Sequence, residues 1–303
     1  MDVFYKKTRD LLSTIDLKLV HGFNGYTENI GSTENVGYEA MLGGYILRNP
    51  GVGFTWNVTG KLAYTRNKIL TLSDELKRET EKRRQTSEYG TLFYEGRSQN
   101  SIYAVRSLGI NPADGEELFL DAEGNVTKTW DPSYRVYCGV GEPTFRGSIN
   151  SLLSYKDLSL NLSFGFHWGG KQYNSTLLDK VEVPVGLEGS GVDRSIINNV
   201  DNRVFTERWQ KAGDYKFFKG YSDEATRSSS RFVMDDKVFQ LQSLSLQYSW
   251  RTGFVKKVLH AETVNLSVNM SDLFYLSSIK RERGTDYPCL LYTSDAADDL
   301  IGV

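Results

Sequence analysis

A two-residue alternation of apolar and polar side chains, repeated over long segments, constrains this chain more than any other feature. In residues 53–66 the even positions carry Phe, Trp, Val, Leu and Tyr, whereas Thr, Asn and Lys occupy most odd positions. Residues 158–168 repeat the pattern, with Leu, Phe or Trp at every even position. Because successive side chains of a β-strand point to opposite faces, both segments predict strands with one apolar and one polar face.

Further segments predict strands of the same kind, the last two with a weaker pattern: 145–155, 244–250, 264–270, 2–7 and 35–47. The longest segments exceed the about five or six residues of an average strand in soluble proteins. They reach the about nine to eleven residues that a tilted strand needs to cross a bilayer. The polar faces are rich in Ser, Thr, Asn and Gln, so the pattern is typical of a membrane barrel with an apolar outside and a wet lumen. A large soluble β-sandwich has the same periodicity and remains an alternative.

Aromatic residues gather at the ends of these segments, where an amphipathic ring would lie at the level of the lipid headgroups. The expected lipid-facing aromatic belt consists of Phe54, Trp56, Tyr64, Tyr155, Phe166, Trp168, Tyr248 and Trp250.

The connections between the predicted strands alternate in length. Short connections are expected at 48–52, 156–157 and 251–260, and long ones at 9–34, 169–237 and from 271 onward. Outer-membrane barrels have short periplasmic turns and long extracellular loops, which favours the barrel.

The 169–237 connection is the candidate ligand or partner loop, because aromatic and cationic side chains on loops commonly make binding contacts. Its candidate residues are Tyr173, Arg208, Trp209, Tyr215, Phe217 and Phe218. Alternatively, Phe217 and Phe218 pack the loop against itself. Asp201, Glu207 and Asp214 lie in the same loop, and we interpret them as solvated charges rather than as the carboxylate pair of a glycosidase.

The composition argues against several other classes of protein. Lys and Arg total 36 and Asp and Glu 38, so the basic surplus of a nucleic-acid-binding protein is missing. Two Cys and three His do not suit a disulfide scaffold or a His-rich metal site. Residues 73–85 predict a solvated helix capped by Ser73, and 121–125 predict a turn rather than a calcium loop. We therefore expect no cofactor, no metal, no nucleic-acid partner and no enzymatic activity.

Several motifs, in this order, resemble those of the SusC/RagA-type TonB-dependent outer-membrane transporters. They lie at residues 2–12, 34–39 (Glu-Asn-Val-Gly-Tyr-Glu), 54–69, 95–103 (Glu-Gly-Arg-Ser-Gln-Asn-Ser-Ile-Tyr), 108–115 (Leu-Gly-Ile-Asn-Pro-Ala-Asp-Gly), 155–160, 169–174 (Gly-Gly-Lys-Gln-Tyr-Asn), 230–233 (Ser-Arg-Phe-Val) and 272–288. The last two are most similar to the family pattern. The resemblance extends over residues 1–288, and it rests on the order and spacing of the motifs.

This resemblance implies an all-β fold: an open, curved antiparallel sheet of about eight to ten strands from a parent 22-stranded transmembrane barrel in the outer membrane. It implies energy-coupled import of oligosaccharides or peptides, with a SusD-like surface lipoprotein and the TonB complex as partners. TonB would act through an N-terminal part that the family pattern places before this chain. Rival functions are another class of TonB-dependent receptor, a passive porin, and a secreted β-sandwich that binds or cleaves glycans.

Residues 289–303 are expected to be a non-native tail. The peptide Cys-Leu-Leu-Tyr-Thr-Ser-Asp-Ala-Ala-Asp-Asp (289–299) resembles the translation of a sequencing-library transposon adapter, and such a scar is excluded from fold reasoning. The expected barrel segment is therefore 1–288.

A sheet with open edges predicts how the isolated chain behaves. Open edges in lipid leave unsatisfied backbone groups that cost several kcal/mol each, so residues 1–303 expressed alone should not form a membrane-inserted barrel. Outer-membrane fractionation followed by unheated gel electrophoresis checks this. A compact species that changes mobility on heating would contradict the assignment to a larger barrel.

Overall fold

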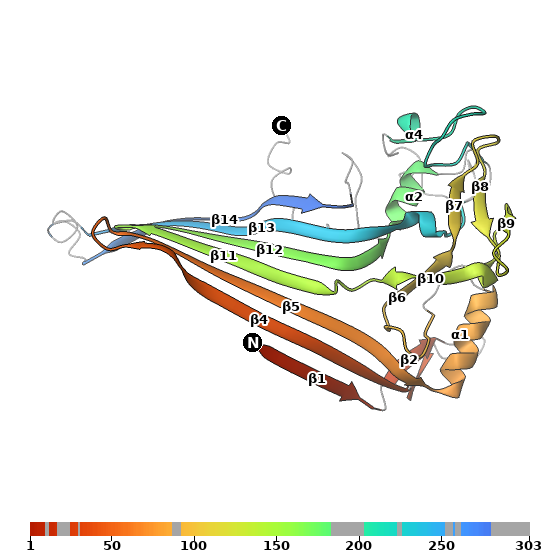
Figure 1. Cartoon of the computed structure of the whole chain (residues 1–303), viewed down its shortest axis with the longest axis horizontal. Helices are drawn as coiled ribbons and strands as arrows, with labels where there is room; N and C mark the ends of the chain where they lie inside the picture. Colours follow the sequence, from red (N-terminus) through yellow and green to blue (C-terminus); the bar gives the residue numbers. More distant parts are fainter. Residues whose placement is uncertain are drawn as a thin grey trace.

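Seven long strands form one antiparallel sheet in this computed structural model, which describes residues 1–9, 12–16, 25–29, 31–86, 92–182, 203–222, 226–251, 257 and 262–279. In spatial order the strands are β1 (Asp2–Thr8), β4 (Gly31–Asn49), β5 (Phe54–Leu72), β11 (Phe145–Tyr155), β12 (Leu158–Tyr173), β13 (Val233–Trp250) and β14 (Val264–Ser277). Figure 1 shows them as a single layer of long strands. The predicted open antiparallel sheet is confirmed; its described part has seven strands, against the eight to ten expected.

Smaller elements complete the described chain. β2 (Leu12–Asp16) and β3 (Gly25–Asn29) pair with each other. The connection between β5 and β11 contains α1 (Asp74–Thr86), β6 (Ser101–Val105), β7 (Ser107–Ile110), β8 (Glu117–Leu120), β9 (Val126–Thr127), η2 (Pro132–Tyr134) and β10 (Arg135–Val140). The connection between β12 and β13 contains α2 (Ser175–Val181), α4 (Arg203–Thr206) and η3 (Ser230–Phe232).

Tight turns join the strands at one end of the sheet. Between β4 and β5, the N–H of Gly53 donates to the Pro50 carbonyl over 3.2 Å, and Gly53 has a positive φ of 71°. Lys156, between β11 and β12, also has a positive φ, 52°. Both short connections are confirmed. The third predicted one, 251–260, lies mostly outside the described residues.

The long connections lie at the other end, and the structure corrects their bounds. The predicted 169–237 loop shortens to 174–232, because β12 continues to Tyr173 and β13 begins at Val233. Residues 271–277 belong to β14 and are not a loop; a bulge opposite Leu241 and Ser243, with Asp272 at a positive φ of 52°, interrupts the alternation there. The sequence analysis also missed that residues 73–144 form one long connection, because its short strands resembled separate hairpins.

We call the region formed by the described residues of 73–144 and 174–232 the cap. Figure 1 places α1, α2 and the strands β6 to β10 together at the right-hand end of the long strands. Among the described residues, a cluster of buried hydrophobic side chains lies in this cap; it consists of Leu177, Val181, Val204, Phe218 and Phe232. No described helix is long and apolar enough to cross a membrane.

The strand register brings the apolar positions of neighbouring strands onto one face. Trp56 pairs with Leu153, which pairs with Leu160; Leu160 pairs with Leu246, and Leu246 with Val268. Among the described residues no second layer covers this face, and Leu246 and Val268 are 38% and 52% exposed. A β-sandwich buries its apolar face against a second sheet, so the structure excludes the sandwich alternative.

The opposite face is polar across the same strands. Thr59 pairs with Asn150, Asn150 with Ser163, Ser163 with Ser243, and Ser243 with Ser271. The sheet therefore has one face suited to lipid and one suited to water, as the alternation predicts.

The predicted aromatic belt separates into two groups on the apolar face. Phe54, Tyr155 and Tyr248 lie in one cross-strand row at the turn end, with Trp56 and Trp250 nearby in sequence. Tyr64, Phe166 and Trp168 lie toward the cap, joined by Phe145, whose ring centroid is 5.2 Å from those of Tyr64 and Trp168.

The spacing of the two aromatic groups fits the thickness of a membrane. Tyr64 follows Phe54 by ten residues on β5, or about 33 Å at roughly 3.3 Å per residue. With a tilt of about 40°, this corresponds to the apolar band of about 25 Å in outer-membrane barrels. Their contact with lipid stays a prediction.

Substitution by arginine at matched positions tests which face meets lipid. Leu162→Arg, about midway between the aromatic groups, should cost about 2–4 kcal/mol of unfolding free energy, and Leu158→Arg, near the turn end, about 0–1 kcal/mol. Ser163→Arg on the opposite face should be tolerated. Denaturant unfolding of the complete receptor, inserted in lipid, measures all three, and equal costs for Leu162→Arg and Ser163→Arg would contradict the assignment of faces.

Candidate functional site in the cap

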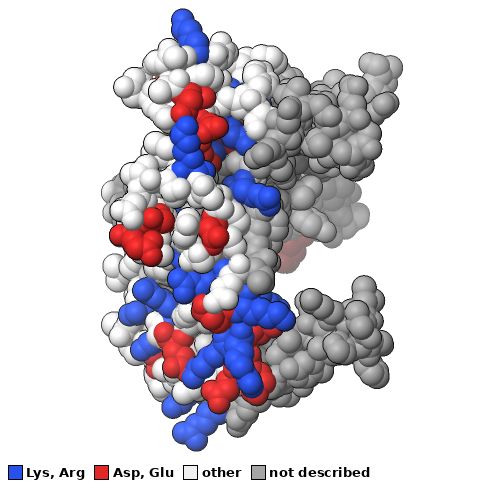
Figure 2. Space-filling model, turned by 90° about the vertical axis from the view of Figure 1, so that its right-hand side faces the viewer, with Lys and Arg blue, Asp and Glu red and all other residues white. Residues whose placement is uncertain are grey.

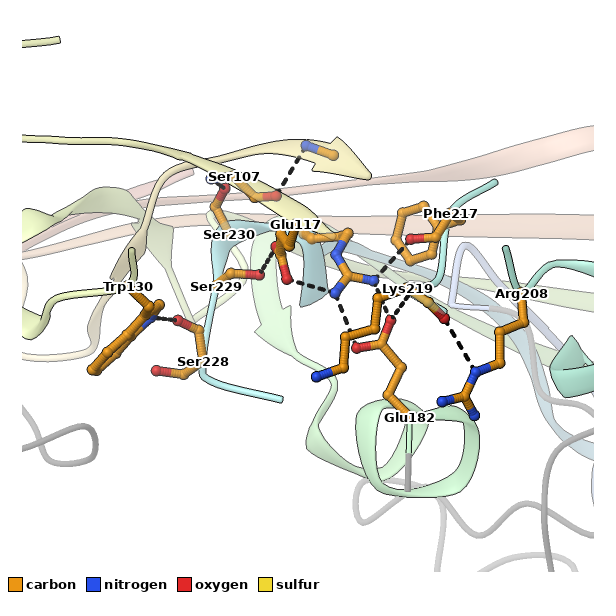
Figure 3. Close-up of polar contacts among 12 residues, drawn as sticks. Ser107, Glu117, Trp130, Glu182, Arg208, Phe217, Lys219, Ser228, Ser229 and Ser230 are labelled. Atoms are coloured by element: carbon orange, nitrogen blue, oxygen red, sulfur yellow. Dashed lines mark hydrogen bonds and ion pairs between the residues drawn. The ribbon is translucent and has the colours of Figure 1, made fainter. Parts of the chain in front are cut away.

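Arg231 of η3 ties together distant segments of the cap. Its Nη1 donates to Glu182 Oε1 over 2.6 Å and to the Phe217 carbonyl over 2.8 Å. Its Nη2 donates to Glu117 Oε2 over 2.6 Å and to Glu182 Oε2 over 3.0 Å. Figure 3 shows Glu117 and Glu182 converging on one guanidinium. Glu117 begins β8 and Glu182 follows α2, so this ion network joins the two long connections.

The network is almost completely buried. The side chains of Arg231, Glu117 and Glu182 are 3%, 5% and 0% exposed. Burial by itself would raise the pKa of Glu182, but the hydrogen bonds and positive charge of Arg231 outweigh it and hold the pKa below its ordinary value of 4.5. The remaining acceptor positions are also used: Ser229 Oγ donates to Glu117 over 2.6 Å and the Lys219 N–H to Glu182 over 2.8 Å.

Residues within and directly before α2 hold this helix beside the network. Asn174 precedes the helix, and its side chain accepts a hydrogen bond of 2.9 Å from the Leu177 N–H, which caps the helix N-terminus. Leu177 and Val181 then face the buried cluster with Phe232. Glu182 is consequently held next to the core at the end of α2.

The predicted loop residues divide into buried and exposed ones. Arg208 is 3% exposed and donates to the carbonyls of Val181, Lys219 and Gly220. Phe218 is 2% exposed. These two residues hold the loop together, whereas Tyr215 is 87% exposed.

The other predicted loop residues lie between these extremes. The Phe217 and Phe218 rings lie 6.3 and 6.4 Å from the ring of Phe232, at the end of the connection, so the loop does pack against itself. The Tyr173 ring lies 6.3 Å from that of Phe232. The Trp209 indole donates to the Pro112 carbonyl over 3.0 Å, and a Cβ at Gly115 would lie 2.4 Å from its ring.

A cavity of about 500 Å³ lies next to the ion network, between the two connections. It exposes the aromatic rings of Trp130, Trp209 and Tyr221, together with charges of both signs: Asp114, Glu116, Lys128, Lys219 and Arg227. Lys128 bridges Asp114 and Glu116 at 2.6 and 3.0 Å. Figure 2, which views the cap end on, likewise shows acidic and basic side chains intermixed over its surface. The cavity can stack a flat group and pair with either charge.

Other motifs of the sequence analysis have structural roles. Ser73 Oγ accepts from the Leu76 N–H over 3.3 Å and caps α1, and Asp121 accepts from the N–H groups of Glu123 and Asn125 in a turn. Both predictions are confirmed. Asp214 accepts from backbone N–H groups in its own turn, and Asp201 lies outside the described residues. No metal-binding cluster is found among the described residues.

Sequence reasoning missed the ion network itself. The Ser-Arg-Phe-Val motif at 230–233 contributed to the family resemblance, but nothing in it identifies the partners of Arg231. Glu117 and Glu182 lie 114 and 49 residues away in the chain, and only the fold brings them together.

Removing the guanidinium group of Arg231 should destabilise the cap. Arg231→Met leaves two carboxylates buried without a counter-charge and should cost about 3–5 kcal/mol of cap stability. Hydrogen exchange of the amides in α2 and residues 217–222 measures it. Arg78→Met, which breaks an exposed pair with Glu75, is the control and should change stability by less than about 1 kcal/mol. Unchanged exchange in Arg231→Met would contradict a structural role for the network.

The same network predicts a pH dependence. Because the folded-state pKa of Glu182 is lowered, its stabilisation is fully present above the ordinary value of 4.5 and is lost as the pH falls through the lower folded-state value. Cap amides should therefore keep constant exchange protection, corrected for intrinsic rates, from neutral pH to about 4.5. Loss of protection well above that pH would show that Glu182 is not held in its charged form.

Comparisons with known proteins identify the fold and its relatives. The chain matches no protein-family model. TonB-dependent receptor P3 of Formosa agariphila is 28% identical over 305 aligned residues, which cover 95% of this chain and 28% of the receptor. TonB-dependent receptor P26 of the same organism is 31% identical over 270 residues, covering 82% of this chain and 25% of the receptor.

Solved structures show the same architecture. The structure of the RagAB peptide transporter matches with a TM-score of 0.74 and 18% identity, over 90% of this chain and 29% of that chain. The RagAB peptide importer in its closed-closed state matches with a TM-score of 0.70. This chain thus spans little more than a quarter of the length of these relatives. It is homologous to part of the TonB-dependent receptors, which are outer-membrane β-barrels, and its sheet and cap have the fold of part of the RagA barrel.

Proposed function

We propose that this chain belongs to a SusC-type TonB-dependent transporter that imports peptides or oligosaccharides across the outer membrane. Its seven-stranded sheet, which we call the wall, would form part of the barrel, and its cap would lie on the extracellular side. The observation that carries the proposal is the one-layer sheet. Its apolar face lacks a protein partner among the described residues, and its opposite face is polar. Such a sheet is stable in lipid as part of a closed barrel with a wet lumen.

The two ends of the sheet differ in a way that supports one orientation of the barrel in the membrane. Turns of a few residues lie at one end and the folded cap at the other. Outer-membrane barrels keep short turns on the periplasmic side and long loops outside. The cap would therefore face the medium, where cargo is first captured.

The cap cavity is the candidate cargo site. Its rings of Trp130, Trp209 and Tyr221 suit stacking, and its acidic and basic side chains suit a peptide, whose two ends carry opposite charges. Peptide cargo also agrees with the similarity of the fold to the RagAB peptide transporter. An oligosaccharide would use the rings and would gain little from the charged side chains.

The exposed side of the cap is the candidate surface for a SusD-like lipoprotein. Tyr215 and Phe205 are 87% and 65% exposed, and large exposed aromatic side chains commonly anchor protein interfaces. The complex named RagAB supports a two-protein assembly of this kind. Coupling to TonB would use parts of the receptor beyond this chain.

Two single substitutions separate cargo binding from lipoprotein binding. In the complete receptor, Tyr221→Ala removes a ring that lines the cavity and should weaken the binding of a peptide mixture about tenfold. Tyr215→Ala, outside the cavity, should leave peptide binding unchanged and reduce co-purification of the lipoprotein. Peptide and oligosaccharide binding by calorimetry, with pull-down of the lipoprotein, measures both effects.

The outcomes decide between the cargo classes and the rival functions. Oligosaccharide binding that Tyr221→Ala weakens would assign the cavity to glycans, and binding that neither variant changes would place the cargo site elsewhere. Uptake that persists in cells lacking TonB would contradict energy-coupled import and favour a passive pore.

A further inference from the structure

A small cavity lies against β5 on the cap side of the aromatic residue Tyr64. β5 pairs with β11 as far as Tyr64, and the N–H of Thr65 donates to the Thr144 carbonyl over 3.1 Å. The next backbone-to-backbone hydrogen bond between β5 and the 73–144 connection is made by Ile69, whose N–H donates to the Arg97 carbonyl over 2.8 Å. The cavity, of about 220 Å³, lies beside the intervening stretch of β5, where β11 has left the strand.

Two arginines give this cavity a positive charge. Arg66 and Arg97 both line it, and neither forms an ion pair within the described part of the chain. The Arg97 guanidinium lies over the ring of Tyr137, 4.2 Å from its centroid. Glu142 also lines the cavity, and its Oε1 accepts a hydrogen bond from Asn100 Nδ2 over 2.5 Å. With two guanidinium groups and one carboxylate, the cavity has an excess positive charge.

The position of the cavity relative to the apolar face narrows the choice of anion. Tyr38, Tyr64, Phe145 and Trp168 form a row of rings across the cap-side end of that face, with centroids 5.2–5.8 Å apart. Arg66 follows Tyr64 by two residues, so it projects from the same face about 6–7 Å nearer the cap. Aromatic rows lie at the headgroup level of a membrane, which places Arg66 level with headgroup phosphates.

We propose that this cavity binds the phosphate group of an anionic lipid in the outer leaflet, with Arg66 and Arg97 as its ligands. Guanidinium groups recognise phosphate oxygens through paired N–H donors, and basic pockets beside a membrane-facing surface bind anionic headgroups. Leu62 and Tyr64, directly below on the apolar face, provide a surface for the acyl chains. The location in the outer leaflet rests on the proposed function; the anion site rests on the cavity itself.

The test uses the complete receptor, purified in detergent and shown to be a folded barrel by its heat-dependent mobility on gels. Receptor reconstituted in phosphatidylcholine vesicles with and without lipid A is then extracted, and the retained lipid A is measured by mass spectrometry. Wild type should retain lipid A. The double variant Arg66→Gln/Arg97→Gln should bind it at least about tenfold more weakly, since one hydrogen bond to a charged group contributes about a factor of ten to an affinity.

Controls separate the lipid from other anions and from unfolding. Arg78→Gln, which removes an exposed charge of α1 outside the cavity, should retain lipid A like wild type. Inorganic phosphate in excess should not displace the lipid, because the acyl chains contribute to its binding. Wild-type retention by the double variant would overturn the site, and full displacement by inorganic phosphate would overturn the lipid as its ligand. Both results are independent of peptide uptake, so failure of this site is distinguishable from failure of the transporter proposal.

Discussion

The register between the long strands decides which side chains share a face of the sheet. Side chains alternate between the two faces of a strand, so a shift of one residue in one strand would move its whole apolar set to the polar face. Trp56, Leu153, Leu160 and Leu246 lie in one row because every pairing between them is in phase. Tight turns such as Lys156-Asp157 preserve that phase from one strand to the next.

Whereas the sheet leaves one apolar face uncovered among the described residues, the cap buries its apolar side chains in protein. Its core of Leu177, Val181, Phe218 and Phe232 is buried in protein, as in a water-soluble domain. Its centre also holds the ion network around Arg231, which costs desolvation energy and so contributes more to arrangement than to net stability. One guanidinium with two carboxylates on separate connections allows a single relative placement of β8, α2 and η3. The chain thus combines a wall whose apolar face is suited to lipid with a cap organised by its own core.

The two proposed sites correspond to these two parts. The cavity beside Trp130 and Trp209 lies within the cap, where mixed charges and rings can meet a soluble cargo. The cavity beside Arg66 and Arg97 lies where the wall ends and the cap begins. A lipid held there would contact residues 64–67 of β5 and residues 96–98 together, and would support the cap against the membrane surface.

The long strands of the sheet could be predicted from the order of the residues. Alternation in 53–66 and 158–168 identified the strands and their apolar faces, since a period of two is a local property that needs no knowledge of partners. The Ser73 cap and the 121–125 turn were also predictable, because each is closed by side chains within a few residues. Three features became visible only in the folded chain: which loop residues are buried, that 73–144 is one connection, and which carboxylates Arg231 meets. Those contacts join residues that are far apart in the chain, and their geometry arises only once the strand register has brought the two long connections to the same end of the sheet.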